Sequence, residues 1–191
     1  MPIGVLALQG DFREHVNTLT SLGVDSIELR TVSDLEKCTA LIIPGGESTA
    51  IQKLATNFGL LEPIQSAIRN GLPTFGTCAG LIMLADEILD GISGQFGFGG
   101  LDVSVRRNAF GNQLESFETQ LTFEGISGSK IEAAFIRAPI VERVGEKVQI
   151  LSTLNDGRVV AVRNETILGI SFHPEISGEK RVHEYFVGMI S

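Results

Sequence analysis

Cys78 lies at the centre of a Gly-Thr-Cys-Ala-Gly segment, residues 76–80. Apolar residues precede and follow this segment, so the sequence predicts a strand, a sharp turn and a helix. The pattern G-x-C-x-G is the thiol version of the G-x-S-x-G turn that presents a nucleophilic serine. Its glycines permit a tight turn, and the N-terminus of the following helix favours the thiolate, the reactive form of cysteine. We therefore expect Cys78 to be a nucleophile, although the segment alone also fits a buried, unreactive cysteine beside a glycine-rich turn.

A base for this thiol is predicted at His173, which directly follows an apolar run in the segment Ser-Phe-His-Pro-Glu, residues 171–175. Pro174 favours an extended backbone at His173, and side chains two residues apart in an extended segment point to the same side. Glu175 can therefore accept a hydrogen bond from the imidazole, fix its tautomer and support its positive charge. These residues predict a Cys-His-Glu catalytic triad of Cys78, His173 and Glu175.

The His-x-Glu spacing also fits a solvated loop end or half of a metal site. Zinc deaminases carry this spacing, but they need a Pro-Cys-x-x-Cys segment downstream, and the sequence has no such segment. We therefore expect no metal and no other cofactor. His15 and His183 fall in predicted helices and are expected on the surface, and Cys38 is expected to be structural.

Acyl chemistry also needs N–H donors for a developing oxyanion. A Pro-Gly-Gly segment at residues 44–46 follows a predicted strand, at the sheet edge where open α/β sheets bind ligands. The backbone N–H of Gly46 and that of Ala79, directly after the nucleophile, are the predicted donors. A plain turn is the alternative for the Pro-Gly-Gly segment. Another glycine-rich segment, residues 95–100, lacks the lysine of a phosphate-binding loop and is expected to be a flexible loop.

The elements that must position these residues alternate between strands and helices over the first hundred residues. Apolar runs predict strands at about residues 3–8, 26–30, 41–43 and 73–75, and residues with helical spacing lie between them. Asp11 is expected to cap the first of these helices. This order predicts a doubly wound, mostly parallel sheet with helices on both faces.

After about residue 100 the pattern changes to a series of strands. They are expected at residues 101–105, 117–123, 131–136, 148–154, 159–163 and 167–172. Asn155-Asp156-Gly157 is a hairpin signal, so antiparallel strands are expected to extend the sheet in the C-terminal half. A closing amphipathic helix is expected over residues 181–190. The sequence shows no repeat and no linker, which predicts a single α/β domain over residues 1–191.

The composition limits the partners and the location of the protein. The 191 residues carry a formal net charge of −8, which argues against a general nucleic-acid-binding surface. No apolar run approaches the ~20 residues needed to cross a membrane, and the first residues lack the pattern of a signal peptide. Two cysteines do not make a disulfide framework. We expect a cytoplasmic protein that binds neither nucleic acid nor membrane.

Several motifs along the chain resemble those of class I, triad-type glutamine amidotransferases. The order of Cys before His-x-Glu differs from that of α/β-hydrolases, in which the acid precedes the histidine. The chain is similar above all to one family, the glutaminase subunit of pyridoxal 5′-phosphate synthase. The motifs that carry this resemblance are G-V-L-A-L-Q-G at 4–10 with E-H at 14–15, P-G-G-E-S-T at 44–49, G-T-C-A-G at 76–80, R-N-A-F-G at 107–111, S-F-E at 116–118, F-I-R-A-P at 135–139 and S-F-H-P-E at 171–175.

The resemblance implies a flavodoxin-like, class I glutamine amidotransferase fold and hydrolysis of L-glutamine to L-glutamate and ammonia. It also implies that the ammonia passes to a barrel-type synthase subunit, in a hetero-oligomer, which makes pyridoxal 5′-phosphate. By motif it implies the same triad, and the implied glutamine-binding positions are Gly46, Glu47, Ser48, Arg107, Ile136 and Arg137. A guanidinium suits the α-carboxylate of glutamine, because it binds a carboxylate bidentately.

The choice of Arg107 depends on its neighbours in the sequence. Arg106 precedes it, so a shift by one residue is conceivable, but the Asn-x-Phe-Gly that follows favours Arg107.

Two other functions stay open from the sequence. A cysteine hydrolase of the related peptidase or deglycase type would share the turn around Cys78 but would not need the Arg107 and Arg137 motifs. A non-catalytic, flavodoxin-like regulatory module would share the fold and keep an inactive site.

Overall fold

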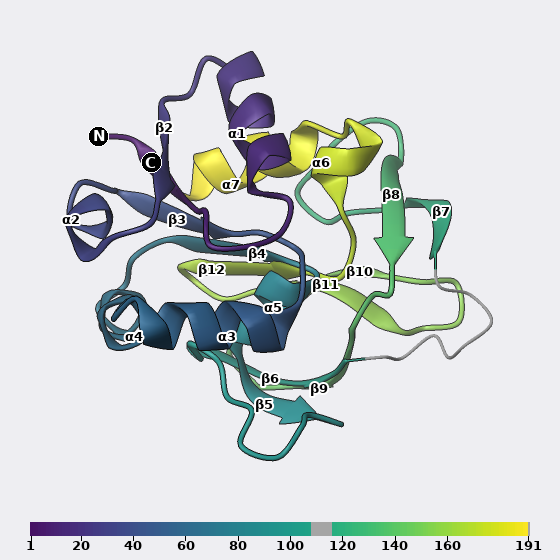
Figure 1. Cartoon of the computed structure of the whole chain (residues 1–191). Helices are drawn as coiled ribbons and strands as arrows, with labels where there is room; N and C mark the ends of the chain where they lie inside the picture. The colour runs from purple at the N-terminus through teal and green to yellow at the C-terminus, as the bar shows by residue number, and fades with distance from the viewer. Residues whose placement is uncertain (108–115, 191) are drawn as a thin grey trace.

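The structure, a computed structural model, describes residues 1–107 and 116–190, and Figure 1 shows its helices and strands. Within this part of the chain, ten strands form one mixed sheet. They are β1 Ile3–Leu6, β2 Ser26–Leu29, β3 Ala40–Ile43, β4 Thr74–Thr77, β5 Ala85–Leu89, β6 Leu101–Arg106, β9 Ile140–Val144, β10 Gln149–Thr153, β11 Val159–Arg163 and β12 Ile167–Ile170. Nine of them follow the order β2-β1-β3-β4-β12-β11-β9-β6-β5, and β10 pairs with β11.

The first five strands of this order run parallel, which confirms the predicted doubly wound core. All residues of β1, β3, β4 and β12 are buried, as expected for strands covered on both faces. Beyond β12 the pairing becomes antiparallel through β11, β9 and β6. The predicted hairpin turn at residues 155–157 joins β10 to β11, which are also antiparallel.

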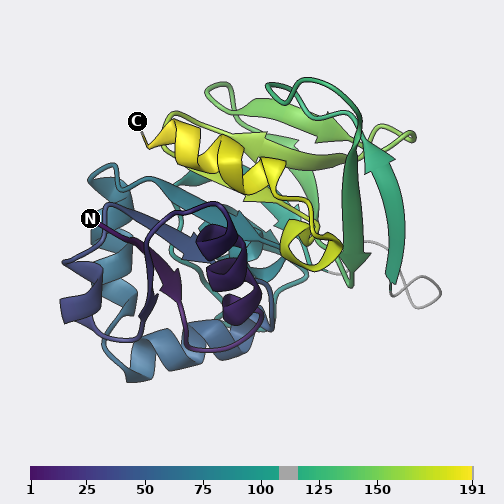
Figure 2. The same ribbon diagram turned by 90° about the horizontal axis from the view of Figure 1, so that it is seen from above.

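Helices cover both faces of the sheet (Figures 1 and 2). One face carries α1 Phe12–Ser21 and α7 Arg181–Met189, and the other carries α3 Ser48–Asn57, α4 Leu61–Arg69 and α5 Ala79–Leu84. Each face has its own apolar cluster. Ile42 belongs to the cluster with Leu19 and Phe186, whereas Ile43 belongs to the cluster with Ile51. Successive residues of one strand therefore supply the two cores, as the alternation of a strand requires.

Four short elements were not predicted from the sequence. These are α2 Val32–Leu35, β5, β9 and α6 Pro174–Ser177. Residues 86–87 of β5 are charged and exposed, so this edge strand shows no apolar run. The predicted strands at 3–8 and 167–172 are too long, since both end two residues earlier.

Two further strands, β7 Ser116–Leu121 and β8 Ile131–Ile136, form a separate antiparallel ribbon. The stacked rings of Phe117 and Phe135, with centroids 4.7 Å apart, join the two strands. The ribbon lies beside α6 (Figure 2). The backbone carbonyl of Ile136, the last residue of β8, accepts a hydrogen bond from the thiol of Cys78 at 3.8 Å.

Among the described helices, none combines the length and the apolar character that crossing a bilayer requires.

Candidate active site

Cys78 occupies the turn between β4 and α5, as the strand-turn-helix prediction requires. It is the N-cap residue of α5, with φ 50° and ψ −104°, a conformation that few non-glycine residues adopt. Gly76 and Gly80, two residues before and after Cys78, must be glycine because backbone atoms lie too close for a side chain. A Cβ on Gly80 would lie 2.0 Å from the carbonyl oxygen of Ile43, and one on Gly76 would lie 2.6 Å from the backbone of Gly80. The helix can therefore approach the sheet closely enough to hold Cys78 in this turn.

His173 follows β12 and is the N-cap residue of α6, with φ −114° and ψ 86°, which lies just outside the extended region that was expected. Its Nδ1 lies 2.8 Å from Oε1 of Glu175, so the predicted contact between the two side chains is confirmed. Its backbone N–H donates to the carbonyl of Ala134 in β8 at 2.8 Å, which fixes the start of α6 against the ribbon. Nδ1 is thus engaged, and Nε2 is the ring nitrogen left for the thiol of Cys78.

The charges in this group depend on one another. Burial favours neutral His173, but hydrogen bonds and charge interactions with Cys78 and Glu175 outweigh it and raise the pKa of His173 to about 10. Burial raises the pKa of Glu175, and the contact with His173 opposes this effect. A thiolate, an imidazolium and a carboxylate in a row therefore stabilise one another. The catalytic roles of the three residues stay a prediction.

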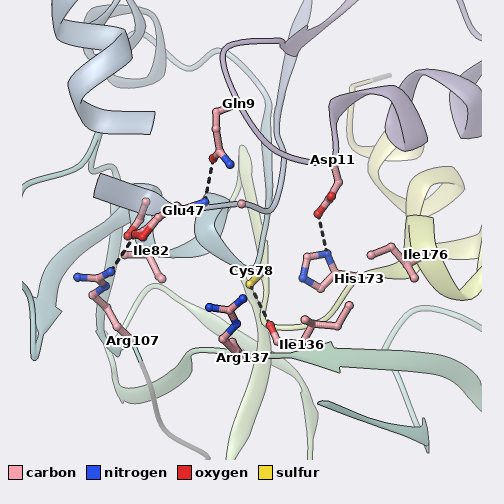
Figure 3. A pocket seen from close by; sticks show the side chains of 12 residues that line it. Gln9, Asp11, Glu47, Cys78, Ile82, Arg107, Ile136, Arg137, His173 and Ile176 are labelled. Carbon is pink, nitrogen blue, oxygen red and sulfur yellow. Dashed lines mark hydrogen bonds and ion pairs between the residues drawn. The ribbon is translucent and has the colours of Figure 1, made fainter. Parts of the chain in front are cut away.

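Asp11 is a second carboxylate on the same imidazole. Its Oδ2 lies 3.5 Å from Nδ1 of His173 (Figure 3). The prediction that Asp11 caps α1 is right in position only, because its side chain makes no capping hydrogen bond. Within the described ranges, Asp11, His173 and Glu175 are a group whose ligand atoms could hold a metal ion. A metal on Nδ1 would have to replace the 2.8 Å bond to Glu175, so the geometry fits a paired imidazole better than a ligand set.

The predicted glutamine-binding positions meet in one cavity of about 470 Å³ in front of Cys78 and His173 (Figure 3). Gly46, Glu47, Ser48, Arg107, Ile136 and Arg137 all line it, together with Gln9, Asp11, Ile82 and Ile176. Glu175 does not line the cavity and lies behind His173. Ala79 begins α5, where the first N–H groups have no partner within the helix.

The segment that carries Gly46 is held by Gln9. Oε1 of Gln9 accepts a hydrogen bond of 2.8 Å from the N–H of Glu47. Gly46 has φ 145°, and a Cβ there would lie 2.4 Å from the same Oε1. Only glycine fits both the backbone angle and the space. The oxyanion roles of Gly46 and Ala79 stay a prediction.

Arg107, not Arg106, faces the cavity. Arg106 pairs on the other side of β6 with Asp90 and, at 2.7 Å, with Glu142. Arg107 instead donates from Nη2 to Oε1 of Glu47 at 3.0 Å. The geometry therefore favours Arg107 over Arg106, and the role of Arg107 in binding glutamine stays a prediction. The remaining residues of that motif, 108–111, lie outside the described residues.

Gln95 contacts two residues that line the cavity, but it was not predicted, because it begins the segment expected to be a flexible loop. Its Oε1 accepts from Nη1 of Arg107 at 2.7 Å, and its Nε2 donates to Oγ of Ser48 at 2.9 Å. It therefore joins two predicted glutamine-binding residues. No spacing rule singles it out, and only its glutamine side chain at the start of a glycine-rich segment could have suggested it.

The prediction of surface positions for His15 and His183 is wrong. Both side chains are fully buried, behind Glu175 and between α1, α7 and β4. The prediction for Cys38 fits better, because its thiol is buried and donates to the carbonyl of Asp34 at 3.1 Å.

Comparison with known proteins gives one consistent family. The SNO glutamine amidotransferase family matches residues 5–191. The chain is 57% identical over 185 residues to the pyridoxal 5′-phosphate synthase subunit PdxT of Leifsonia xyli subsp. xyli, covering 97% of this chain and 93% of the relative. It is 54% identical over 188 residues to the protein of the same name from Clavibacter sepedonicus, covering 98% and 90%.

Two solved structures are similar to this chain in fold. A crystal structure described as a glutamine amidotransferase superposes with a TM-score of 0.92 at 46% identity, covering 100% of this chain and 99% of the other. A putative GMP synthase component from Thermoplasma acidophilum superposes with a TM-score of 0.71 at 18% identity, covering 100% and 94%, which shows the shared fold.

Proposed function

Because the chain belongs to the SNO glutamine amidotransferase family, we propose that it hydrolyses L-glutamine to L-glutamate and ammonia through Cys78, His173 and Glu175. The observation that carries this proposal is the 2.8 Å contact between His173 Nδ1 and Glu175 Oε1, with the Cys78 thiol as the other partner of the imidazole. A base oriented by a carboxylate beside a strained nucleophile is the arrangement that covalent acyl transfer needs.

The reaction begins when the Cys78 thiolate attacks the side-chain carbonyl carbon of glutamine. A C–S bond forms, and the carbonyl oxygen becomes an oxyanion that the N–H groups of Gly46 and Ala79 stabilise. The imidazolium of His173 gives its proton to the amide nitrogen, the C–N bond breaks, and ammonia leaves. A thioester to Cys78 remains.

Water then completes the cycle. Neutral His173 takes a proton from water, and the resulting hydroxide attacks the thioester carbon. The C–S bond breaks, glutamate leaves, and the thiolate of Cys78 faces the imidazolium again. Glu175 keeps the ring oriented and balances its charge in both halves of the reaction.

The cavity suits an amino-acid substrate. Arg107 and Arg137 both line it, and a guanidinium can hold the α-carboxylate with two parallel hydrogen bonds. The carboxylate of Glu47, half exposed in the same cavity, is an acceptor for the α-ammonium group. A peptidase would need neither group at these positions, which supports glutamine as the substrate.

We propose that the ammonia is used by a barrel-type synthase subunit, in a hetero-oligomer that makes pyridoxal 5′-phosphate. The support is the similarity over nearly the full chain to subunits named for that synthase.

We also propose a single domain over residues 1–191, supported by the family match to residues 5–191. A cytoplasmic location is proposed because both cysteines are unpaired, as reducing compartments keep them.

The test is release of ammonia and glutamate from L-glutamine, measured with the matching synthase subunit present. We expect Cys78→Ala to lose turnover and to keep the fold. Normal turnover by this variant would refute the proposed triad. Labelling of Cys78 by a glutamine-like electrophile would exclude a non-catalytic module, and turnover of peptides in place of glutamine would favour the hydrolase alternative.

A further inference from the structure

A line of buried polar side chains continues behind the triad, on the side away from the cavity. Nδ1 of His173 contacts Oε1 of Glu175 at 2.8 Å, and the same oxygen lies 3.5 Å from Nε2 of His15. Nδ1 of His15 lies 2.9 Å from Nε2 of His183. His15 and His183 are both 0% exposed. The line therefore joins α1 and α7 to the residue that orients the proposed base.

The two rings of this line are fixed in place by their neighbours. Phe75 of β4 packs edge-on against both, with ring centroids 6.1 Å from His15 and 5.5 Å from His183. The hydroxyl of Thr77 in β4 lies 3.2 Å from Nε2 of His15. Nε2 of His15 therefore faces a carboxylate oxygen, which can only accept a hydrogen bond, and a hydroxyl, which can accept or donate one.

Both imidazoles are neutral in this surrounding. Burial lowers the pKa of His183 to about 4. Burial, and then repulsion by His183 and His173, lowers the pKa of His15 well below its usual value. The other titratable groups that act on this cluster are Glu175 and Asp11. Each neutral ring carries one N–H, so the line of hydrogen bonds has a direction.

One direction is less costly for the buried groups than the other. If His183 carries its proton on Nε2, it donates to Nδ1 of His15, and the N–H of His15 then sits on Nε2 and faces Glu175. In the reverse direction, the proton of His183 would sit on Nδ1, which is buried and has no hydrogen-bond partner within the described part of the chain. The lone pair of His15 Nε2 could then accept from the hydroxyl of Thr77, but it would also face the carboxylate at 3.5 Å. An unpaired buried N–H and a lone pair against an anion are both costly.

We propose that His15 and His183 are positioning residues for Glu175, with His183 Nε2–H donating to His15 and His15 Nε2–H directed at the Glu175 carboxylate. The proposal rests on the assignment of Glu175 to the triad. Among the described residues, Oε2 of Glu175 is buried without a partner, so the carboxylate depends on the donors around Oε1. His173 and the backbone N–H of Glu175 itself supply two donors, and Nε2–H of His15, 3.5 Å away, supplies a longer third contact. Loss of the His15 donor raises the pKa of Glu175 further and leaves its side chain less firmly held, and a protonated or displaced carboxyl group supports the imidazolium of His173 less well.

The direction of the hydrogen bonds between these histidines can be measured without an activity assay. The chain has three histidines, so the ring nitrogens of the ¹⁵N-labelled chain can be assigned by NMR with single-histidine variants. At pH 7 we expect His15 and His183 to be neutral and protonated on Nε2. A proton on Nδ1 of His15, or a charged His15 ring, would overturn the proposal.

The effect on the site is measured by alkylation of Cys78 with iodoacetamide across the pH range, followed at the peptide that contains Cys78. We expect His15→Phe to need a higher pH for half-maximal alkylation and to react roughly 10- to 100-fold more slowly at pH 7, as for loss of a hydrogen bond to a charge. His15→Gln, whose amide can donate to the same carboxylate, is expected to restore most of the rate. A wild-type profile in His15→Phe would refute the positioning role.

Leu19→Ala is the matched control, because Leu19 is a fully buried residue of the same helix with no polar group. It lowers the melting temperature without moving the pH profile. If His15→Phe does not fold, the profiles of His15→Gln and His15→Asn decide, since a merely structural role gives both the same profile. A wild-type chain whose Cys78 reacts no faster than a free thiol would instead refute the proposed triad itself.

Discussion

Gln95 holds the guanidinium of Arg107 in the cavity, accepting from its Nη1 at 2.7 Å while its own amide nitrogen donates to Ser48 at 2.9 Å. Neither contact involves the reacting atoms. Within the described ranges, Nε of Arg107 is buried without a partner, so the orientation of this side chain depends on the contacts of its two terminal nitrogens, with Gln95 and with Glu47.

We predict that Gln95→Ala raises the KM for glutamine about fivefold and changes kcat little, because one hydrogen bond of ~1 kcal/mol orients the residue proposed to bind the α-carboxylate. The measurement is steady-state glutaminase kinetics with the synthase subunit present. Gln52→Ala is the control, since Gln52 contacts the same loop through hydrogen bonds to Gly94 and Phe96 and not through Arg107. An equal rise in KM for both variants would show that the loop matters, and not the bond to Arg107.

Glu175→Gln is predicted to move the alkaline limb of the pH–rate profile to lower pH. Contacts with Cys78 and Glu175 raise the pKa of His173 to about 10 against the effect of burial. Removal of the negative charge lowers that pKa, so the proton that ammonia needs is lost at a lower pH. We expect kcat/KM at pH 7 to fall at least tenfold.

Asp11→Asn is the matched variant for this test. Asp11 lies at 3.5 Å from the same nitrogen and its side chain is 37% exposed, so solvent screens it and its effect should be smaller. A larger shift in Asp11→Asn than in Glu175→Gln would contradict the assignment of Glu175 as the orienting carboxylate.

The stability of the protein is predicted to fall as the pH drops from 6.5 towards 4. Burial lowers the pKa of His183 to about 4, so below pH 6.5 the unfolded chain binds a proton that the folded chain excludes. Linkage then removes stability on the acid side, up to about 3 kcal/mol for this residue. His15 acts in the same direction.

Denaturant unfolding of the wild type and of His183→Gln at several pH values measures this contribution. The variant should lose less stability between pH 6.5 and pH 4 than the wild type does. Val182→Ala, a fully buried neighbour in α7 without an ionisable group, should lower the stability by the same amount at every pH. Parallel curves for the wild type and His183→Gln would show that His183 is not the group that titrates.

Contacts between residues that are close in the sequence were predictable, and contacts between residues that only the fold brings together were not. The turn around Cys78 and the His173–Glu175 pair each lie within five residues, and backbone geometry alone brings their side chains together. Gln95 contacts residues 47 and 12 positions away. No periodicity reports contacts of that kind.

His15 and His183 were mispredicted for a different reason. The prediction of surface positions used only their place in predicted helices, although the spacing of the two residues carries a further signal. His15 lies three residues after Phe12 and four before Leu19, and His183 lies three before Phe186, so both share the apolar face of their helices. A polar residue on such a face needs a buried partner, and each histidine is the partner of the other at 2.9 Å.

Glycine substitutions test the close approach of α5 to the sheet. A Cβ at position 80 would lie 2.0 Å from the carbonyl oxygen of Ile43, which is backbone and cannot move aside alone. We predict that Gly80→Ala displaces α5, removes glutaminase activity and lowers the free energy of unfolding by several kcal/mol, about the scale of severe overpacking.

Gly188→Ala is the control, because Gly188 lies within α7 and a Cβ there meets nothing within 4 Å. Alanine favours a helix over glycine by ~1 kcal/mol, so this variant should be slightly more stable and fully active. Thermal unfolding and ammonia release measure both variants, and an active, stable Gly80→Ala protein would mean that the turn around Cys78 does not need the close contact.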